Sequence, residues 1–178
     1  MEKPDYFFSR LSVFLFCLLF LFAFGFSSLT AEEVSNDRAY PYSLGGGVEM
    51  NLNTREGAAM GYGAALDRYF IYAEDKGLLR AGVRFAMQSD FDGISATEGD
   101  IFVRYNLLRL GPGDIFTQLS WGFSSYREDE IMANTMLTGF SAGYRFYFLG
   151  GFYVEPYIRT GFPFLFGTGV MAGHWFSF

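Results

Sequence analysis

The sequence predicts an all-β protein, an eight-stranded antiparallel up-and-down transmembrane β-barrel. Three observations lead to this prediction. From residue 42 onward, the chain alternates between two kinds of side chain with the two-residue period of a β-strand. No second run of about 18 apolar residues follows the N-terminal segment, so no helical span is expected there. Aromatic residues make up 21% of the 178 residues, a high share for a water-soluble domain.

The first 31 residues have the pattern of a secretory signal peptide. Lys3 and Arg10 precede the apolar run Leu11–Phe26, and the small residues SSLTA follow it. We expect cleavage after Ala31, which leaves residues 32–178 as an exported barrel domain. The apolar run is long at 16 residues, so an uncleaved N-terminal anchor is the alternative.

Turn sequences separate eight alternating segments, which we take as the strands. In chain order, 42–52 is followed by NTREG, 58–70 by EDKG, 78–88 by SDFDGISATEG, 99–107 by LGPGD, 114–125 by YREDEIMANT, 135–148 by LGG and 152–162 by FPF, and 166–178 is the eighth. Pro156 lies within the seventh segment. Because proline cannot donate to a β-ladder, we expect a bulge or kink there.

The two faces of these strands differ in kind. One face is apolar and is expected to carry no charged residue; it includes Met60, Tyr62, Leu66, Val83, Phe85, Val103, Tyr105, Leu119, Trp121, Phe140, Tyr144, Ile158, Val170 and Phe176. The other face holds charged residues and nearly all of the strand glycines. In a soluble barrel of the lipocalin kind the apolar face would point inward. Small residues suit a narrow interior and large aromatic residues suit lipid, so we expect the apolar face outside.

The charged face predicts a lumen closed by ion pairs. Its members are Glu49, Asp67, Arg80, Arg84, Asp100, Arg104, Arg145, Glu155 and Arg159. An unpaired charge inside a narrow barrel is costly, so these groups should pair. We expect Arg145 and Arg80 to share Glu155 and Asp67 low in the barrel. Glu49 should bridge Arg84 or Arg159 nearer the middle, where Arg104 is also expected. An eight-stranded barrel is just wide enough for side chains to fill, so a packed lumen is favoured over an open pore.

The last residues, HWFSF, place Phe176 and Phe178 on one face of a strand. This ending, with Val170 and Ala172 before it, resembles the final strand of bacterial outer-membrane barrel proteins; His174 departs from that pattern. The hairpin GFYVEPYIRTG and GTGVMAG is similar to the closing hairpin of the small OmpA, OmpX and OmpW barrels. The resemblance implies a monomer in the outer membrane and contact with its lipid. It also implies that periplasmic chaperones and the barrel assembly machinery handle the chain, with Val170, Phe176 and Phe178 as the assembly signal.

Other chemistries have little support in the sequence. The net charge of −6 argues against a nucleic-acid partner. One cysteine and one histidine exclude a disulfide framework and a Cys/His zinc site, and His174 has no second histidine with which to build a triad. We expect neither enzyme activity nor a cofactor. Asp90 and Asp92 match the first positions of a calcium-binding loop, but the other ligands of such a loop are absent at the required spacing. We therefore interpret this stretch, including Glu98, as a solvated loop.

Two functions remain open. The barrel is either a structural or surface-interaction protein, which uses the segments Ser89–Gly99 and Tyr126–Thr135, or an OmpW-like transporter of small hydrophobic molecules. The aromatic run Phe162–Phe166 supports the second. An apolar pocket behind Phe102, Phe116 and Trp175 would favour transport, and a continuous charged plug would favour the first.

Overall fold

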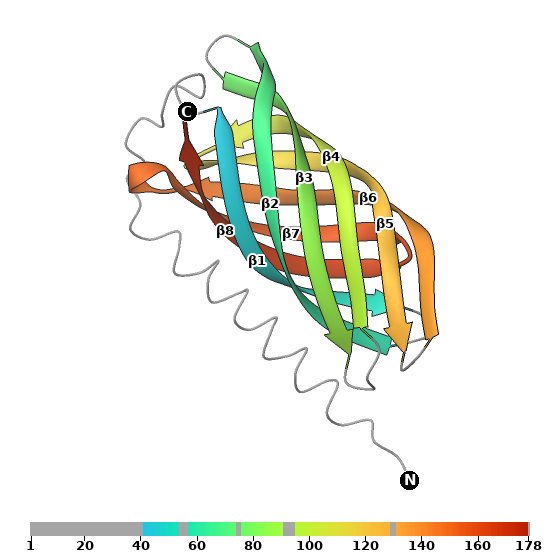
Figure 1. Cartoon of the computed structure of the whole chain (residues 1–178). Helices are drawn as coiled ribbons and strands as arrows, with labels where there is room; N and C mark the ends of the chain where they lie inside the picture. The colour runs from blue at the N-terminus through green and yellow to red at the C-terminus, as the bar shows by residue number, and fades with distance from the viewer. Residues whose placement is uncertain (1–40, 54–56, 74–75, 91–94, 129–130, 178) are drawn as a thin grey trace. The chain divides into compact units, whose positions relative to one another are not determined.

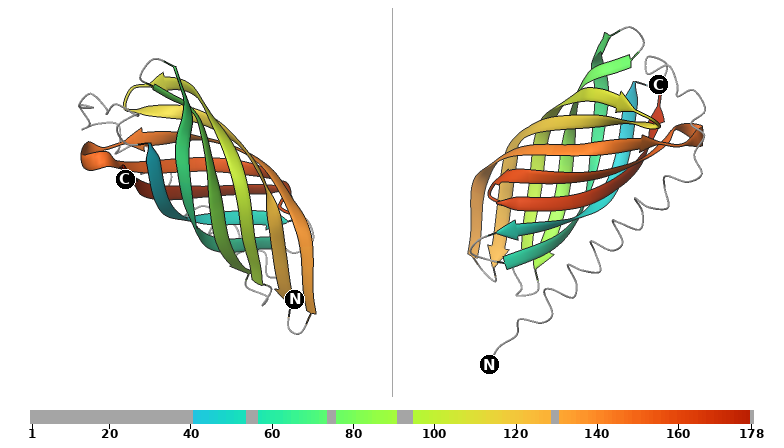
Figure 2. Two further views of the ribbon diagram at one scale, coloured as in Figure 1. Left: turned by 45° about the horizontal axis from the view of Figure 1, so that its top comes forward. Right: turned by 180° about the vertical axis from the view of Figure 1, so that it is seen from behind.

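Eight antiparallel strands form a closed barrel in the computed structural model, which describes residues 41–53, 57–73, 76–90, 95–128 and 131–177. The strands are β1 (Tyr42–Asn53), β2 (Gly57–Ala73), β3 (Lys76–Asp90), β4 (Ser95–Leu110), β5 (Gly113–Glu128), β6 (Ile131–Tyr147), β7 (Phe152–Phe162) and β8 (Phe166–Phe176), with a 3₁₀ turn η1 (Leu149–Gly151) before β7. Each strand pairs with the next along the chain (Figures 1 and 2). The predicted fold class is therefore confirmed. The predicted signal peptide, residues 1–31, lies outside the described residues.

The barrel closes between its first and last strands. Tyr42 pairs with Phe176, and the antiparallel ladder continues to Leu52 and Phe166. This pairing removes the open edge that a sheet would otherwise present. We call the end of the barrel that carries Tyr42 and Phe176 the terminal end, and the end that carries Asn53 and Gly57 the distal end.

The distal hairpins are longer than the sequence predicted. β4 begins at Ser95 and β6 at Ile131, so most of the two segments expected as loops lies within strands. These extensions have polar residues on both faces, so their hydrophobic alternation is weaker than that of the strand centres. Backbone pairing with the neighbouring strands holds these residues in the sheet: Ser95 of β4 pairs with Ser89 of β3 and with Arg127 of β5.

The bulge expected at Pro156 is absent. Pairing between β6 and β7 stops after Gly143 and Tyr157 and resumes in the same register at Phe146 and Val154. Proline thus removes a donor from the ladder without inserting an extra residue. The register shifts lie elsewhere, at Tyr69–Tyr72 in β2 and at Asn106–Leu108 in β4, both near the terminal end.

The outer wall is apolar, as predicted. Trp121 is 53% and Phe123 71% exposed, with similar values for many outward aliphatic and aromatic side chains. The expectation that this face lacks charge is wrong at Arg68. Its side chain is exposed at the terminal end, and its guanidinium carbon lies 5.1 Å from the centre of the Tyr42 ring. A long side chain at the end of a strand can cover apolar surface while its charge stays in a polar layer. No helix in the described part of the chain is long and apolar enough to cross a membrane.

Glycine on the inner face leaves room for large inward side chains. A Cβ atom at Gly45 of β1 or at Gly173 of β8 would collide with the hydroxyl end of Tyr153, which reaches across from β7. Tyr153 is only 1% exposed and packs with Tyr69, Tyr147 and Trp175. The missing side chains on β1 and β8 therefore allow an aromatic group to fill the lumen at the terminal end.

Candidate functional site

The lumen contains two networks of buried ion pairs, which we treat as the candidate site. The terminal cluster consists of Asp67, Arg80, Arg104, Arg145 and Glu155. The distal cluster consists of Glu49, Arg84, Glu98, Asp100 and Arg159. The nine charged residues expected in the lumen, from Glu49 to Arg159, all belong to one cluster or the other.

In the terminal cluster, Glu155 is the shared acceptor. Its Oε2 lies 2.5 Å from Arg145 Nε and 2.6 Å from Arg104 Nη1, and its Oε1 accepts from Arg104 Nη2 at 2.8 Å. Asp67 pairs closely with Arg80 and more loosely, at 3.7 Å, with Arg145. Glu155 is 1% exposed and Arg80 fully buried, so these pairs are shielded from water.

Aromatic rings flank the three arginines of the terminal cluster. The guanidinium carbon of Arg80 lies 4.2 Å from the Tyr69 ring centre and 4.8 Å from that of Trp175. Arg104 lies 4.0 Å from the Phe116 ring centre, and Arg145 lies 4.0 Å from that of Tyr153. Each distance is within the range of a cation–π contact. The terminal lumen is therefore packed with aromatic groups as well as paired charges.

In the distal cluster, Arg84 contacts three carboxylates. Its Nε donates to Asp100 at 2.8 Å, its Nη1 to Glu49 at 3.0 Å and its Nη2 to Glu98 at 2.6 Å. Arg159 contacts Glu98 at 3.0 Å and Glu49 at 3.4 Å. The two arginines thus bridge the same pair of glutamates across the lumen.

Neutral donors complete the distal cluster. Glu49 accepts hydrogen bonds from Asn51 Nδ2 at 2.9 Å, Gln88 Nε2 at 3.1 Å and the Tyr157 hydroxyl at 2.8 Å. The same Gln88 nitrogen donates to Glu98 at 2.9 Å. Five side chains therefore converge on Glu49, counting the two arginines, and it is the centre of this cluster.

Two expectations about the lumen are corrected. Arg104, expected near Glu49, lies opposite Arg80 in the β3–β4 ladder and bonds to Glu155, so it belongs to the terminal cluster. Glu98, expected in a solvated loop, is fully buried and contacts both distal arginines. The two-residue alternation of Glu98, Asp100, Phe102 and Arg104 could have revealed it, had β4 been extended toward residue 95.

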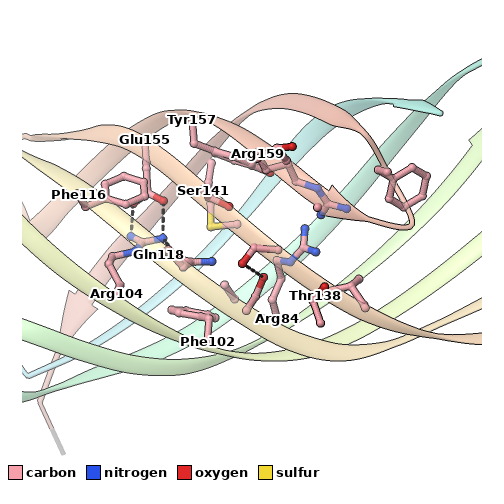
Figure 3. Close-up of a pocket in the computed structure, with 18 of the residues that line it drawn as sticks. Arg84, Phe102, Arg104, Phe116, Gln118, Thr138, Ser141, Glu155, Tyr157 and Arg159 are labelled. Carbon is pink, nitrogen blue, oxygen red and sulfur yellow. Dashed lines mark hydrogen bonds and ion pairs between the residues drawn. The ribbon is translucent and has the colours of Figure 1, made fainter. Parts of the chain in front are cut away.

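A small cavity lies between the clusters. Figure 3 shows Arg104, Phe116 and Glu155 toward one end of it and Arg84 and Arg159 toward the other. The space that the centres of water molecules can occupy in it is about 30 Å³, which leaves room for only a few waters. The aromatic turn after β7 lies over it: Phe164 is 5% exposed, and Arg159 lies 5.3 Å from its ring centre. The lumen contents are thus closer to a charged plug than to an apolar pocket.

Two of the three residues predicted as an assembly signal, Val170 and Phe176, lie on the outer wall. Val170 of β8 pairs with Val48 of β1, and the Phe176 ring stacks on Tyr42 with centroids 5.8 Å apart. Phe178 lies outside the described residues. His174 is exposed, hydrogen-bonds to the Gly150 carbonyl at 2.8 Å and meets the Phe152 ring edge-on. Among the described residues, no group of three or more His, Cys, Asp or Glu side chains could hold a metal ion.

The fold is that of small transmembrane barrels. The chain is similar to the N-terminal β-barrel domain of Pseudomonas aeruginosa OprF, with 12% identity and a TM-score of 0.51, over 77% of this chain and 98% of that one. It is also similar to neisserial surface protein A, with 12% identity and a TM-score of 0.52, over 77% of this chain and 96% of that one. No protein-family model and no curated protein matches the sequence.

Proposed function

We propose that the protein is an integral protein of the bacterial outer membrane that acts as a structural or surface-interaction protein. The observation that carries the proposal is the combination of an apolar outer wall with a lumen closed by two ion-pair clusters. An apolar wall anchors the barrel in lipid. A lumen filled by paired side chains leaves no open channel through it. In this proposal a signal peptide exports the chain, and the terminal end faces the periplasm.

The distal rim is where the proposal places any surface interaction. β7 ends at Phe162, so within the described part of the chain residues 131–137 of β6 pair with β5 and with no second strand. Their free backbone edge can accept an extended segment from a partner, which is a common mode of recognition. Met132 and Met136 on this strand are 63% and 64% exposed.

Cell fractionation and gel mobility test the location and the fold together. The protein should fractionate with the outer membrane, and the folded form should migrate differently from the boiled form. Recovery in the soluble fraction after carbonate extraction would contradict the proposal.

Deleting Phe176–Phe178 tests the assembly signal. The deletion removes the ring that stacks on Tyr42 and shortens the strand that closes the barrel. We therefore expect almost no folded protein in the membrane, measured by the heat-dependent gel shift. Ser177→Ala, which keeps both phenylalanines, is the control and should retain wild-type levels. Wild-type levels after the deletion would show that these residues are not an assembly signal.

Conductance in a planar bilayer separates this function from OmpW-like transport. The wild-type barrel should pass little steady current. Glu49→Ala should raise the current, because five side chains of the distal plug converge on that carboxylate. Arg68→Ala removes a charge outside the lumen and is the matched control. A large stable wild-type current that Glu49→Ala leaves unchanged would favour the transporter.

A further inference from the structure

The terminal cluster carries one more positive than negative charge. Three arginines, Arg80, Arg104 and Arg145, share two carboxylates, Asp67 and Glu155, which leaves a net charge of +1. Asp114 is also buried near this end, but it pairs with Arg109 at 2.9 Å, so that pair adds no net charge. The surplus lies deep in the lumen, because all five residues of the cluster are at most 5% exposed.

Arg80 of the terminal cluster and its neighbour Trp175 have unused hydrogen-bond donors. Among the described residues, Arg80 Nε, Arg80 Nη1 and Trp175 Nε1 are buried and have no hydrogen-bond partner. Only Arg80 Nη2 is used, by Asp67 and by the Ser43 hydroxyl at 2.8 Å. Arg80 is fully buried and Trp175 is 4% exposed, and the guanidinium stacks 4.8 Å from the indole ring centre. Every unused polar atom in this group is a donor, which is the requirement of an anion.

The aromatic neighbours reduce the cost of the surplus charge without removing it. A cation–π contact is worth less than the penalty for an unpaired buried ion, so the rings around Arg80 compensate only in part. A water molecule could accept from the free N–H groups, but it would leave the net charge unchanged. A small anion satisfies both the donors and the charge.

We propose that the terminal lumen binds one small monovalent anion, of the chloride class, beside Arg80 and the indole N–H of Trp175. This site goes beyond the proposed structural role. Such an ion would make barrel packing at the terminal end depend on the halide concentration of the surrounding solution.

Bromide is the probe, because it replaces chloride and quenches indole fluorescence on contact. The chain has two tryptophans, and Trp121 faces outward. Trp121→Phe therefore leaves Trp175 as the only indole reporter. Folded protein in detergent is titrated with sodium bromide against sodium gluconate at constant ionic strength. We expect quenching of Trp175 that saturates, whereas acrylamide, a neutral collisional quencher, should have little effect on this buried ring.

Two arginine variants in the Trp121→Phe background identify the site. Arg80→Met should abolish the saturable quenching. Arg68→Met makes the same chemical change on the outer wall and should retain it. Quenching that rises linearly with bromide, or is equal in the Arg80→Met variant, would overturn the proposal.

Crystals of the wild-type protein grown in bromide provide a measurement that does not depend on the variants folding. An anomalous peak within hydrogen-bonding distance of Arg80 and Trp175 is expected. Density for water alone at that position, or bromide bound only elsewhere, would overturn the proposal.

Discussion

The terminal and distal clusters each contain five charged side chains, yet their charge balance is opposite. The terminal cluster has three arginines to two carboxylates, and the distal cluster has two arginines to three carboxylates. Their neutral neighbours differ in the same sense. Aromatic faces surround the terminal arginines, whereas amide and hydroxyl donors surround Glu49 in the distal cluster.

This difference shows how neutral side chains in a narrow lumen stabilise a local excess of positive or negative charge. The negative face of an aromatic ring favours a surplus cation, and N–H and O–H donors favour a surplus carboxylate. Each cluster therefore has the type of neutral partner that suits its own surplus. The comparison also predicts that removing the scarcer sign from a cluster costs more stability than removing the more abundant one.

The largest effect is expected from Glu155→Gln. This change leaves three arginines with one carboxylate in the drier cluster, and Arg104 and Arg145 lose their shared partner. Breaking a buried pair in this way costs about 3–5 kcal/mol of unfolding free energy. Reversible urea unfolding in detergent or lipid measures it. A cost below that of Glu49→Gln would contradict the charge-balance argument.

A somewhat smaller loss is expected from Arg159→Met. Three distal carboxylates would then share Arg84 alone, but the adjoining cavity can admit water and reduce the penalty. We expect about 2–4 kcal/mol by the same unfolding assay. Arg127→Met, which changes an exposed arginine near the distal rim, is the control and should be close to neutral. A neutral Arg159→Met would indicate that the distal cluster is fully hydrated.

The smallest effect of the three is expected from Glu49→Gln. It leaves two carboxylates and two arginines, and the new amide oxygen can still accept from Asn51 or Tyr157. We expect a loss of about 1–3 kcal/mol, since the hydrogen bonds weaken but no surplus charge is created. Equal costs for Glu49→Gln and Glu155→Gln would show that the two clusters do not differ as proposed.

The sequence by itself determined the architecture and the faces. Alternation with period two assigns the strand residues to the wall or the lumen without knowledge of strand pairing, except at the register shifts in β2 and β4. It placed Trp121 and Val170 outside and Arg145 and Glu155 inside, as the structure has them. Arg68 follows the same alternation and faces outward, so there the face was right and only the expectation of an uncharged wall was wrong.

Only the tertiary structure decided which inward residues meet. The height of a side chain in the lumen depends on strand register and on where each hairpin turns, and alternation contains neither. Arg104 therefore lies opposite Arg80 instead of beside Glu49, and Glu98 enters the lumen because pairing with β3 and β5 extends β4 to Ser95. The opposite charge balance of the two clusters follows from these two placements. It arises because closing the barrel brings together residues that are far apart in the chain, such as Arg104 and Glu155.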